Sequence, residues 1–197
     1  MRTLSPQTES CILDTAEQMF AERHFNEVHF ERIAAEAKIS KVTLYRYFHN
    51  KDELYLRLLE RIGRDYLGRL REAERSVQGC QAKLVALTRL ALSYFDERPH
   101  LLQLLDRAGI DRGRSLGFPW LEVQREFFRM LQGLFAEGTV RGEFAVDDLE
   151  LAVRGLLGIL RFQFLYPCEQ GDDEKIPERV VGMLIRQVKS SSSKRAA

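Results

Sequence analysis

The sequence predicts an all-α fold of about nine helices, divided into a short amino-terminal domain and a larger helical domain. Apolar residues recur at helical spacing along most of the chain, and no run alternates between apolar and polar residues as a half-buried strand would. Four of the five prolines stand where a helix is expected to begin or end. These four are Pro6, Pro99, Pro119 and Pro177.

The first 50 residues predict three helices, over residues 8–23, 30–37 and 41–48. Ser40 precedes the third helix, and its hydroxyl is well suited to accept a hydrogen bond from the first free backbone amides. A fourth, long helix is expected from residue 51 to about residue 75. Asn50 and Glu53 provide a capping box at its start.

The rest of the chain continues the helical pattern. Further helices are expected over residues 82–97, from 99 to before 109, and over 119–137, 146–166 and 174–188. We therefore divide the chain into an amino-terminal domain over 1–51, a second helical domain over 52–189 and a serine-rich, disordered tail over 190–197.

Composition bounds the possible functions. The chain has 197 residues, 45% hydrophobic and 30% charged, which is typical of globular proteins. Three widely separated cysteines form no disulfide framework, which favours a reducing compartment. We expect no membrane span, because no run reaches about 18 apolar residues, and residues 1–10 do not resemble a signal peptide.

The segment 29–48 has the pattern of a helix-turn-helix. With Phe30 in first position, the small Ala34 allows close helix approach, and apolar residues including Leu44 fill the space between the helices. The second helix would enter a major groove. Its outward residues are Lys41, Val42, Thr43, Tyr45, Arg46 and Tyr47. These types can bond phosphate oxygens, touch base edges or contact a thymine methyl.

Charge around this helix separates two interpretations. Residues 38–51 carry four cations and no acid, whereas residues 9–36 carry seven carboxylates against two arginines. A solvated amphipathic hairpin inside an all-helical core would also give apolar and charged faces. However, such a hairpin has no need to expose Tyr45 and Tyr47 together beside an acid-free cationic run, which favours DNA binding.

The motif Ser40-Lys-x-Thr-Leu-Tyr-x-Tyr-Phe-x-x-Lys51 resembles the DNA-binding domain of the TetR family of transcriptional regulators. The apolar pattern of the first helix and the aromatic Phe25 are similar too, so the resemblance covers about residues 8–56. Beyond it, the chain matches the family only in helix number and length. The resemblance implies a helix-turn-helix domain followed by a helical ligand-binding and dimerisation domain.

Site residues follow from the resemblance, position by position. Thr43, Tyr45, Tyr47 and Lys51 stand where family members contact the DNA backbone, and Lys41, Val42 and Arg46 stand where base contacts are often made. Leu44 and Phe48 fall at core positions.

The chain departs from the family pattern around the second helix. His24 and Lys38 replace frequent glycines, and Val28 and His29 replace residues with hydroxyls. We expect a left-handed backbone at Lys38. His29 can replace a phosphate donor, whereas Val28 cannot.

The second domain holds the less specific predictions. The family encloses a small effector between its later helices, and we assign Phe95, Trp120 and Phe127 to such a pocket among several core aromatics. The last two helices carry broad apolar faces that form either intramolecular core or a four-helix dimer interface. Because the resemblance implies a homodimer, we assign to that interface Val153, Leu157, Leu160, Val180 and Leu184.

No catalytic or metal-binding motif is found among the four histidines and three cysteines, so we expect neither an enzyme nor a metal site. The resemblance predicts a bacterial, cytoplasmic, dimeric regulator that binds a palindromic double-stranded DNA operator, most often as a repressor. It needs no cofactor, responds to a small-molecule effector and has no membrane partner. The alternative is a helical protein-interaction module with only nonspecific DNA binding, which would lack the large operator preference of a specific regulator.

Overall fold

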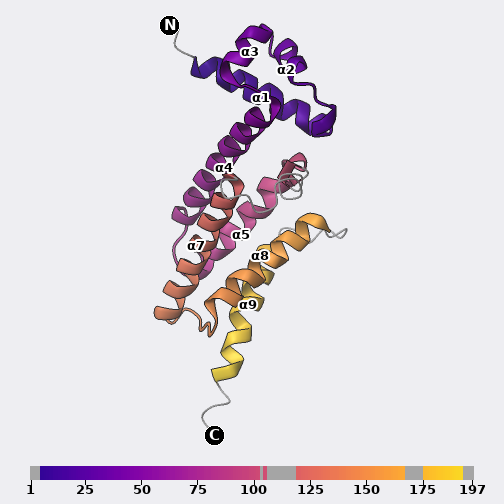
Figure 1. The fold of residues 1–197 in the computed structure, drawn as a ribbon. Helices are drawn as coiled ribbons and strands as arrows, with labels where there is room; N and C mark the ends of the chain where they lie inside the picture. Colours follow the sequence, from indigo (N-terminus) through magenta and orange to yellow (C-terminus); the bar gives the residue numbers. More distant parts are fainter. Residues whose placement is uncertain (1–4, 103, 106–118, 167–174, 193–197) are drawn as a thin grey trace. The chain divides into compact units, whose positions relative to one another are not determined.

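The computed structural model describes residues 5–102, 104–105, 119–166 and 175–192, and every regular element within these ranges is a helix (Figure 1). The prediction of an all-helical protein is confirmed over this part of the chain. The elements are α1 (Pro6–Glu22), η1 (Phe25–Glu27), α2 (Phe30–Glu36), α3 (Lys41–Tyr47), α4 (Lys51–Arg75), α5 (Cys80–Asp96), α7 (Pro119–Val140), α8 (Leu149–Leu165) and α9 (Ile176–Ser192). Residues 100–102 and 104–105 are also helical, and the rest of the helix predicted there lies outside the described residues.

The chain forms two compact units. The first combines Met1–Asp65 with Arg98–Glu122, and the second combines Tyr66–Glu97 with Val123–Ala197. The domain boundary predicted after residue 51 separates functions, whereas these two units are defined by packing. The predicted boundary therefore stays a prediction.

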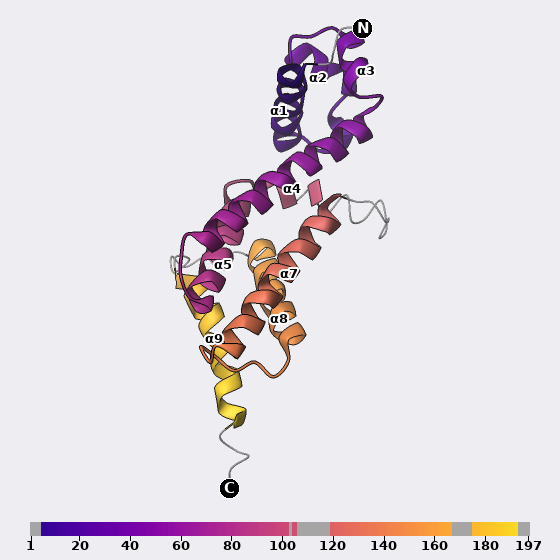
Figure 2. The same cartoon turned by 90° about the vertical axis from the view of Figure 1, so that its left-hand side faces the viewer.

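The first unit is built on the apolar stripes that the sequence predicts. Helix α1 lies beside the start of α4 (Figure 2). It buries five side chains (Ile12, Leu13, Ala16, Met19 and Phe20), and the start of α4 buries Leu54 and Leu58. Helices α1 and α4 are also joined at the surface, where the Arg61 guanidinium contacts Asp14 Oδ1 at 2.6 Å and Glu17 Oε2 at 3.0 Å. The Tyr55 hydroxyl donates to the Leu104 carbonyl and so holds the helical residues around 100–105 against this unit.

The start of α4 uses a modified capping box. The Asn50 Oδ1 accepts a hydrogen bond from Glu53 N at 2.8 Å, as predicted. The Glu53 carboxylate, however, accepts from His49 N at 2.8 Å, one residue before the expected partner. This hydrogen bond lowers the pKa of the Glu53 carboxyl.

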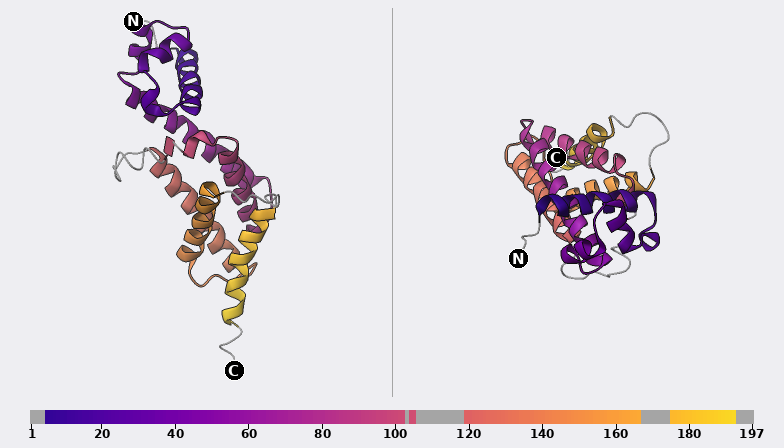
Figure 3. Two further views of the ribbon diagram at one scale, coloured as in Figure 1. Left: turned by 90° about the vertical axis from the view of Figure 1, so that its right-hand side faces the viewer. Right: turned by 90° about the horizontal axis from the view of Figure 1, so that it is seen from above.

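The second unit packs α5, α8 and α9 against one another (Figure 3). Buried aromatic rings fill it: Tyr66 lies 4.8 Å from Tyr94, and Phe95 lies 4.7 Å from Phe164, measured between ring centroids. Burial raises the pKa of Tyr66 far above its ordinary value. At the end of α7, a Cβ on Gly138 would fall 2.2 Å from the Phe144 ring, so this close approach requires glycine.

Several predicted helix ends shift by a few residues for local reasons. Helix α5 begins at Cys80 instead of residue 82, because the Glu143 carboxylate accepts from Cys80 N at 2.8 Å and Gln81 N at 3.2 Å. Helix α8 begins at Leu149 instead of residue 146, because the Asp148 carboxylate caps it through Leu151 N at 2.9 Å. Helix α7 continues to residue 140, and α9 reaches residue 192, three residues into the tail expected to be disordered.

Candidate nucleic-acid interface

Helices α2 and α3 form the predicted helix-turn-helix. Between them, Lys38 has a φ of 55°, the left-handed conformation expected from a side chain standing in a glycine position. Ile39 N donates to Ala34 O at 2.9 Å and closes the turn. Ser40 then caps α3, because its hydroxyl accepts from Thr43 N at 3.0 Å.

Helix α3 has one buried and one exposed face. Leu44 is 0% exposed and Phe48, just after the helix, is 1% exposed, which confirms both as core. On the other face, Val42 is 72% exposed and Tyr45 is 47% exposed. The backbone is therefore anchored by the core side chains, while the side chains that could read DNA point to solvent.

Two charged or aromatic groups on this exposed face already contact α2. Lys41 Nζ lies 2.5 Å from Glu31 Oε2, and this hydrogen bond raises the pKa of the lysine. The Tyr45 ring packs edge-on against Phe30 with centroids 5.2 Å apart. Arg46 is exposed in the last turn of α3.

Tyr47 and Thr43 are more engaged than the sequence suggests. The Tyr47 hydroxyl accepts from Ser5 N at 2.7 Å and donates to Ser5 O at 3.2 Å, so the ring is half-buried. The expectation that Tyr45 and Tyr47 are exposed together is therefore wrong for Tyr47. The Thr43 hydroxyl lies 2.8 Å from the Ser40 hydroxyl and belongs to the helix cap.

Lys51, the first residue of α4, contacts the segment that leads to His29 and α2. Lys51 Nζ donates to Phe25 O at 2.7 Å and Val28 O at 2.8 Å, and it lies 4.2 Å from the centre of the Phe25 ring. Its ammonium thus holds η1 in place, a role that the motif did not indicate. His29 is exposed and precedes α2 without a side-chain cap, while Val28 is buried.

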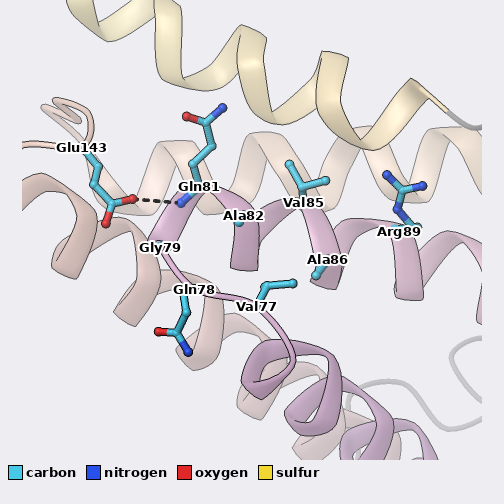
Figure 4. A pocket seen from close by; sticks show the side chains of 9 residues that line it. All are labelled: Val77, Gln78, Gly79, Gln81, Ala82, Val85, Ala86, Arg89 and Glu143. Atoms are coloured by element: carbon cyan, nitrogen blue, oxygen red, sulfur yellow. Dashed lines mark hydrogen bonds between the residues drawn. The ribbon is translucent and has the colours of Figure 1, made fainter.

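The three predicted pocket residues are all buried, and their assignment to an effector pocket stays a prediction. Phe95 and Phe127 both contact Tyr66 in the aromatic core of the second unit, whereas Trp120 belongs to the first unit. A separate groove of about 570 Å³ runs along α5 and the loop before it, from Glu143 to Arg89 (Figure 4). Its lining comes from residues 77–89 and from Glu143, and the sequence analysis assigned no site to them.

The predicted interface residues divide between core and surface. Val153 and Leu160 are buried within the second unit, while Leu157, Val180 and Leu184 are half-buried. Different apolar side chains on α8, directly after α8 and on α9 are strongly exposed. They are Leu151 (66%), Phe162 (63%), Leu165 (48%), Tyr166 (64%) and Met183 (45%).

Two classes of function find no support within the described ranges. Among these residues no group of three or more His, Cys, Asp or Glu side chains is placed to hold a metal ion. None of the helices described is both long and apolar enough to cross a membrane.

Comparisons with known proteins agree with this geometry. Residues 12–58 match the family described as "Bacterial regulatory proteins, tetR family". The chain is 29% identical over 147 residues to the HTH-type transcriptional repressor KstR2 of Rhodococcus jostii, covering 74% of this chain and 72% of that protein.

Solved structures share the fold over nearly the whole chain. FadR from Bacillus subtilis, in complex with stearoyl-CoA, superposes with a TM-score of 0.72 at 20% identity, covering 89% of this chain and 97% of that one. AibR, in complex with isovaleryl coenzyme A and operator DNA, gives a TM-score of 0.72 at 19% identity over 90% and 98% of the two chains.

The exposed α3 on a capped, tightly packed helix-turn-helix defines a DNA-binding protein of the transcription-regulator class. Over residues 12–58 the chain is similar to the tetR family of bacterial regulatory proteins.

Proposed function

We propose that this protein is an effector-responsive repressor of the bacterial cytoplasm that binds a palindromic DNA operator as a homodimer and has no catalytic activity. The observation that carries the proposal is the contrast between the two faces of α3. Leu44 is wholly buried, while Val42 and Tyr45 beside it are exposed. A helix anchored in this way can enter a major groove without disturbing the core beneath it.

The exposed face divides into base-reading and positioning groups. Arg46 is suited to guanine O6 and N7, and the Val42 methyl groups are suited to a thymine methyl. Tyr45, Thr43 and His29 are suited to phosphate oxygens. Tyr47 and Lys51 support the interface from within, because their polar atoms hold Ser5 and η1, respectively.

We assign dimerisation to the exposed apolar face of α8 and α9. Leu151, Gly158 and Phe162 recur along one side of α8 at helical spacing, and Met183 is the exposed apolar residue of the neighbouring α9. Exposed apolar surface of this kind marks interaction sites. A two-fold pair of chains would present two copies of α3 to a palindromic site.

We propose an acyl-coenzyme A thioester as the class of effector. The basis is that two proteins with the same fold, FadR and AibR, bind stearoyl-CoA and isovaleryl coenzyme A, respectively. The aromatic core around Phe95 and Phe127 supplies apolar side chains suited to an acyl chain. Binding would regulate DNA only if the effector prefers one conformation of the protein over the other.

The test is selection of the purified protein against a random duplex library at about 0.15 M salt, followed by sequencing of the bound pool. We expect a palindrome with half-site centres about one helical turn apart. Isovaleryl-CoA or stearoyl-CoA should then release the protein from that site, while free coenzyme A should not. A pool without any enriched sequence would instead support the interaction-module alternative.

The role of Arg46 is tested on the selected site. Arg46→Ala should cost about 1–3 kcal/mol of discrimination at one base pair of each half-site and leave the other positions unchanged. The control is Arg64→Ala on α4, where the guanidinium donates to the Glu60 carbonyl at 3.4 Å. Equal loss at every base pair for Arg46→Ala would show that Arg46 binds the backbone only.

A further inference from the structure

The contact between α2 and the first residue of α3 is not explained by packing. Glu31 lies in the first turn of α2, and its carboxylate binds the Lys41 ammonium at 2.5 Å. Both side chains are half or more exposed, at 50% for Glu31 and 64% for Lys41. An exposed ion pair of this kind contributes little to folding stability. Because the pair lies at the start of α3, the helix proposed to enter the major groove, we expect it to affect DNA binding.

The pair changes what Lys41 can do on DNA. A lysine at the start of a recognition helix could bind any phosphate, and each such contact adds affinity without adding sequence information. A carboxylate on the ammonium cancels its charge locally and repels an approaching phosphate. It also restricts the side chain to one direction, from which Lys41 can donate to a guanine edge.

We propose that Glu31 is a specificity-determining residue of the α3 interface, which suppresses sequence-independent binding by Lys41 and orients it for a base contact. The inference rests on the proposed function, because it assumes that α3 enters the major groove. It predicts that removing the carboxylate raises affinity for random DNA more than affinity for the operator. The ratio of the two affinities, rather than either one alone, is the quantity that Glu31 controls.

The experiment compares wild type with Glu31→Gln on the selected operator and on a random-sequence duplex of equal length, across a salt series. On random DNA, Glu31→Gln should bind about fivefold more tightly per protomer at about 0.15 M salt. The slope of log affinity against log salt should steepen by about 0.9 per protomer. Operator affinity should stay unchanged or fall, so the specificity ratio drops.

The matched control is Glu36→Gln on the same helix. It removes the same charge and also breaks an exposed pair, because Glu36 lies 3.8 Å from Arg32. Its specificity ratio should stay at the wild-type value. A second variant, Lys41→Gln in the Glu31→Gln background, should return the random-DNA affinity and salt slope to wild-type values, because the effect acts through Lys41.

The outcomes separate this inference from the proposed function. If wild type selects an operator but Glu31→Gln raises both affinities equally, or leaves the ratio unchanged, Glu31 has no part in specificity. An effect matched by Glu36→Gln would reduce the observation to general charge and also overturn it. Failure of wild type to prefer any sequence would count against the proposed function itself, and Glu31 would then have no specificity to determine.

Discussion

Helices α3 and α8 both expose apolar side chains, but the residues around these side chains differ between the two helices. On α3 the exposed Val42 lies among Lys41, Tyr45 and Arg46. The helix itself is held by the Ser40 cap and the buried Leu44. On α8 the exposed Leu151 and Phe162 lie on one side of a helix whose opposite side buries Val153. The first is a mixed surface suited to a hydrated, charged groove, and the second is suited to another apolar surface.

The difference shows that exposure alone does not define a binding site. A single apolar residue surrounded by cations and hydroxyls fits a thymine methyl next to phosphates. A continuous apolar stripe has no such polar partner in DNA and gains free energy only when a protein surface covers it. The two helices thus predict two kinds of partner, and substitutions on each should fail in different assays.

The largest expected effect comes from the buried face of α3. Leu44→Ala should lower the free energy of unfolding by about 2–5 kcal/mol, because it leaves a cavity under the helix-turn-helix. Val42→Ala, two residues away but 72% exposed, should change stability by no more than about 0.5 kcal/mol. Chemical denaturation followed by the fluorescence of Trp120, the single tryptophan of the chain, measures both. Equal stability losses would contradict the two-faced arrangement of α3.

On α8 the prediction concerns assembly. Phe162→Glu should convert the dimer to a monomer at micromolar concentration and weaken operator binding by more than about tenfold, because a buried carboxylate has no partner in an apolar interface. The control is Val140→Glu at the end of α7, an equally drastic change at a residue that is 88% exposed. Sedimentation and operator-binding assays should find this control unchanged. A dimeric Phe162→Glu variant would move the interface away from this face.

The α3 region could be predicted from the sequence in more detail than α8, and the reason is physical. The Ser40 cap, the buried Leu44 and the left-handed Lys38 depend on neighbours a few residues away, so local spacing predicts them. The contact between Tyr47 and Ser5 spans 42 residues and has no local signature. On α8 the apolar residues cover most of the circumference, so periodicity could not separate the inward Val153 from the outward Phe162.

A smaller effect is expected at the turn between α2 and α3. Lys38 has a φ of 55°, which costs a residue with a side chain roughly 1–2 kcal/mol relative to right-handed backbone. Lys38→Gly should therefore raise the free energy of unfolding by about 1 kcal/mol or less, since glycine also loses more entropy on folding. Lys38→Gln removes the charge but keeps the strain, and it should show no gain in thermal unfolding. Equal behaviour of the two variants would show that charge, not backbone conformation, is responsible.

The smallest expected effect is a pH dependence at one imidazole of the first unit. His100 Nε2 is buried without a hydrogen-bond partner, 3.8 Å from Glu17 Oε1. Burial lowers the pKa of His100, although Glu17 partly opposes this and Arg98 adds to it. The unfolded chain therefore takes up a proton more readily than the folded one as the pH falls below about 6.5.

The sign of the effect follows from that difference in proton uptake. Stability contributed by neutral His100 is present above pH 6.5 and is lost as the pH falls towards its lowered folded-state pKa. Wild type should lose more thermal stability between about pH 7.5 and pH 5.5 than His100→Asn, which cannot titrate. These two pH values lie about one unit above and below the ordinary histidine pKa. Trp120 fluorescence reports on the same unit and separates this loss from events elsewhere. A larger loss in His100→Asn than in wild type would mean that protonated His100 gains more from Glu17 than burial costs it.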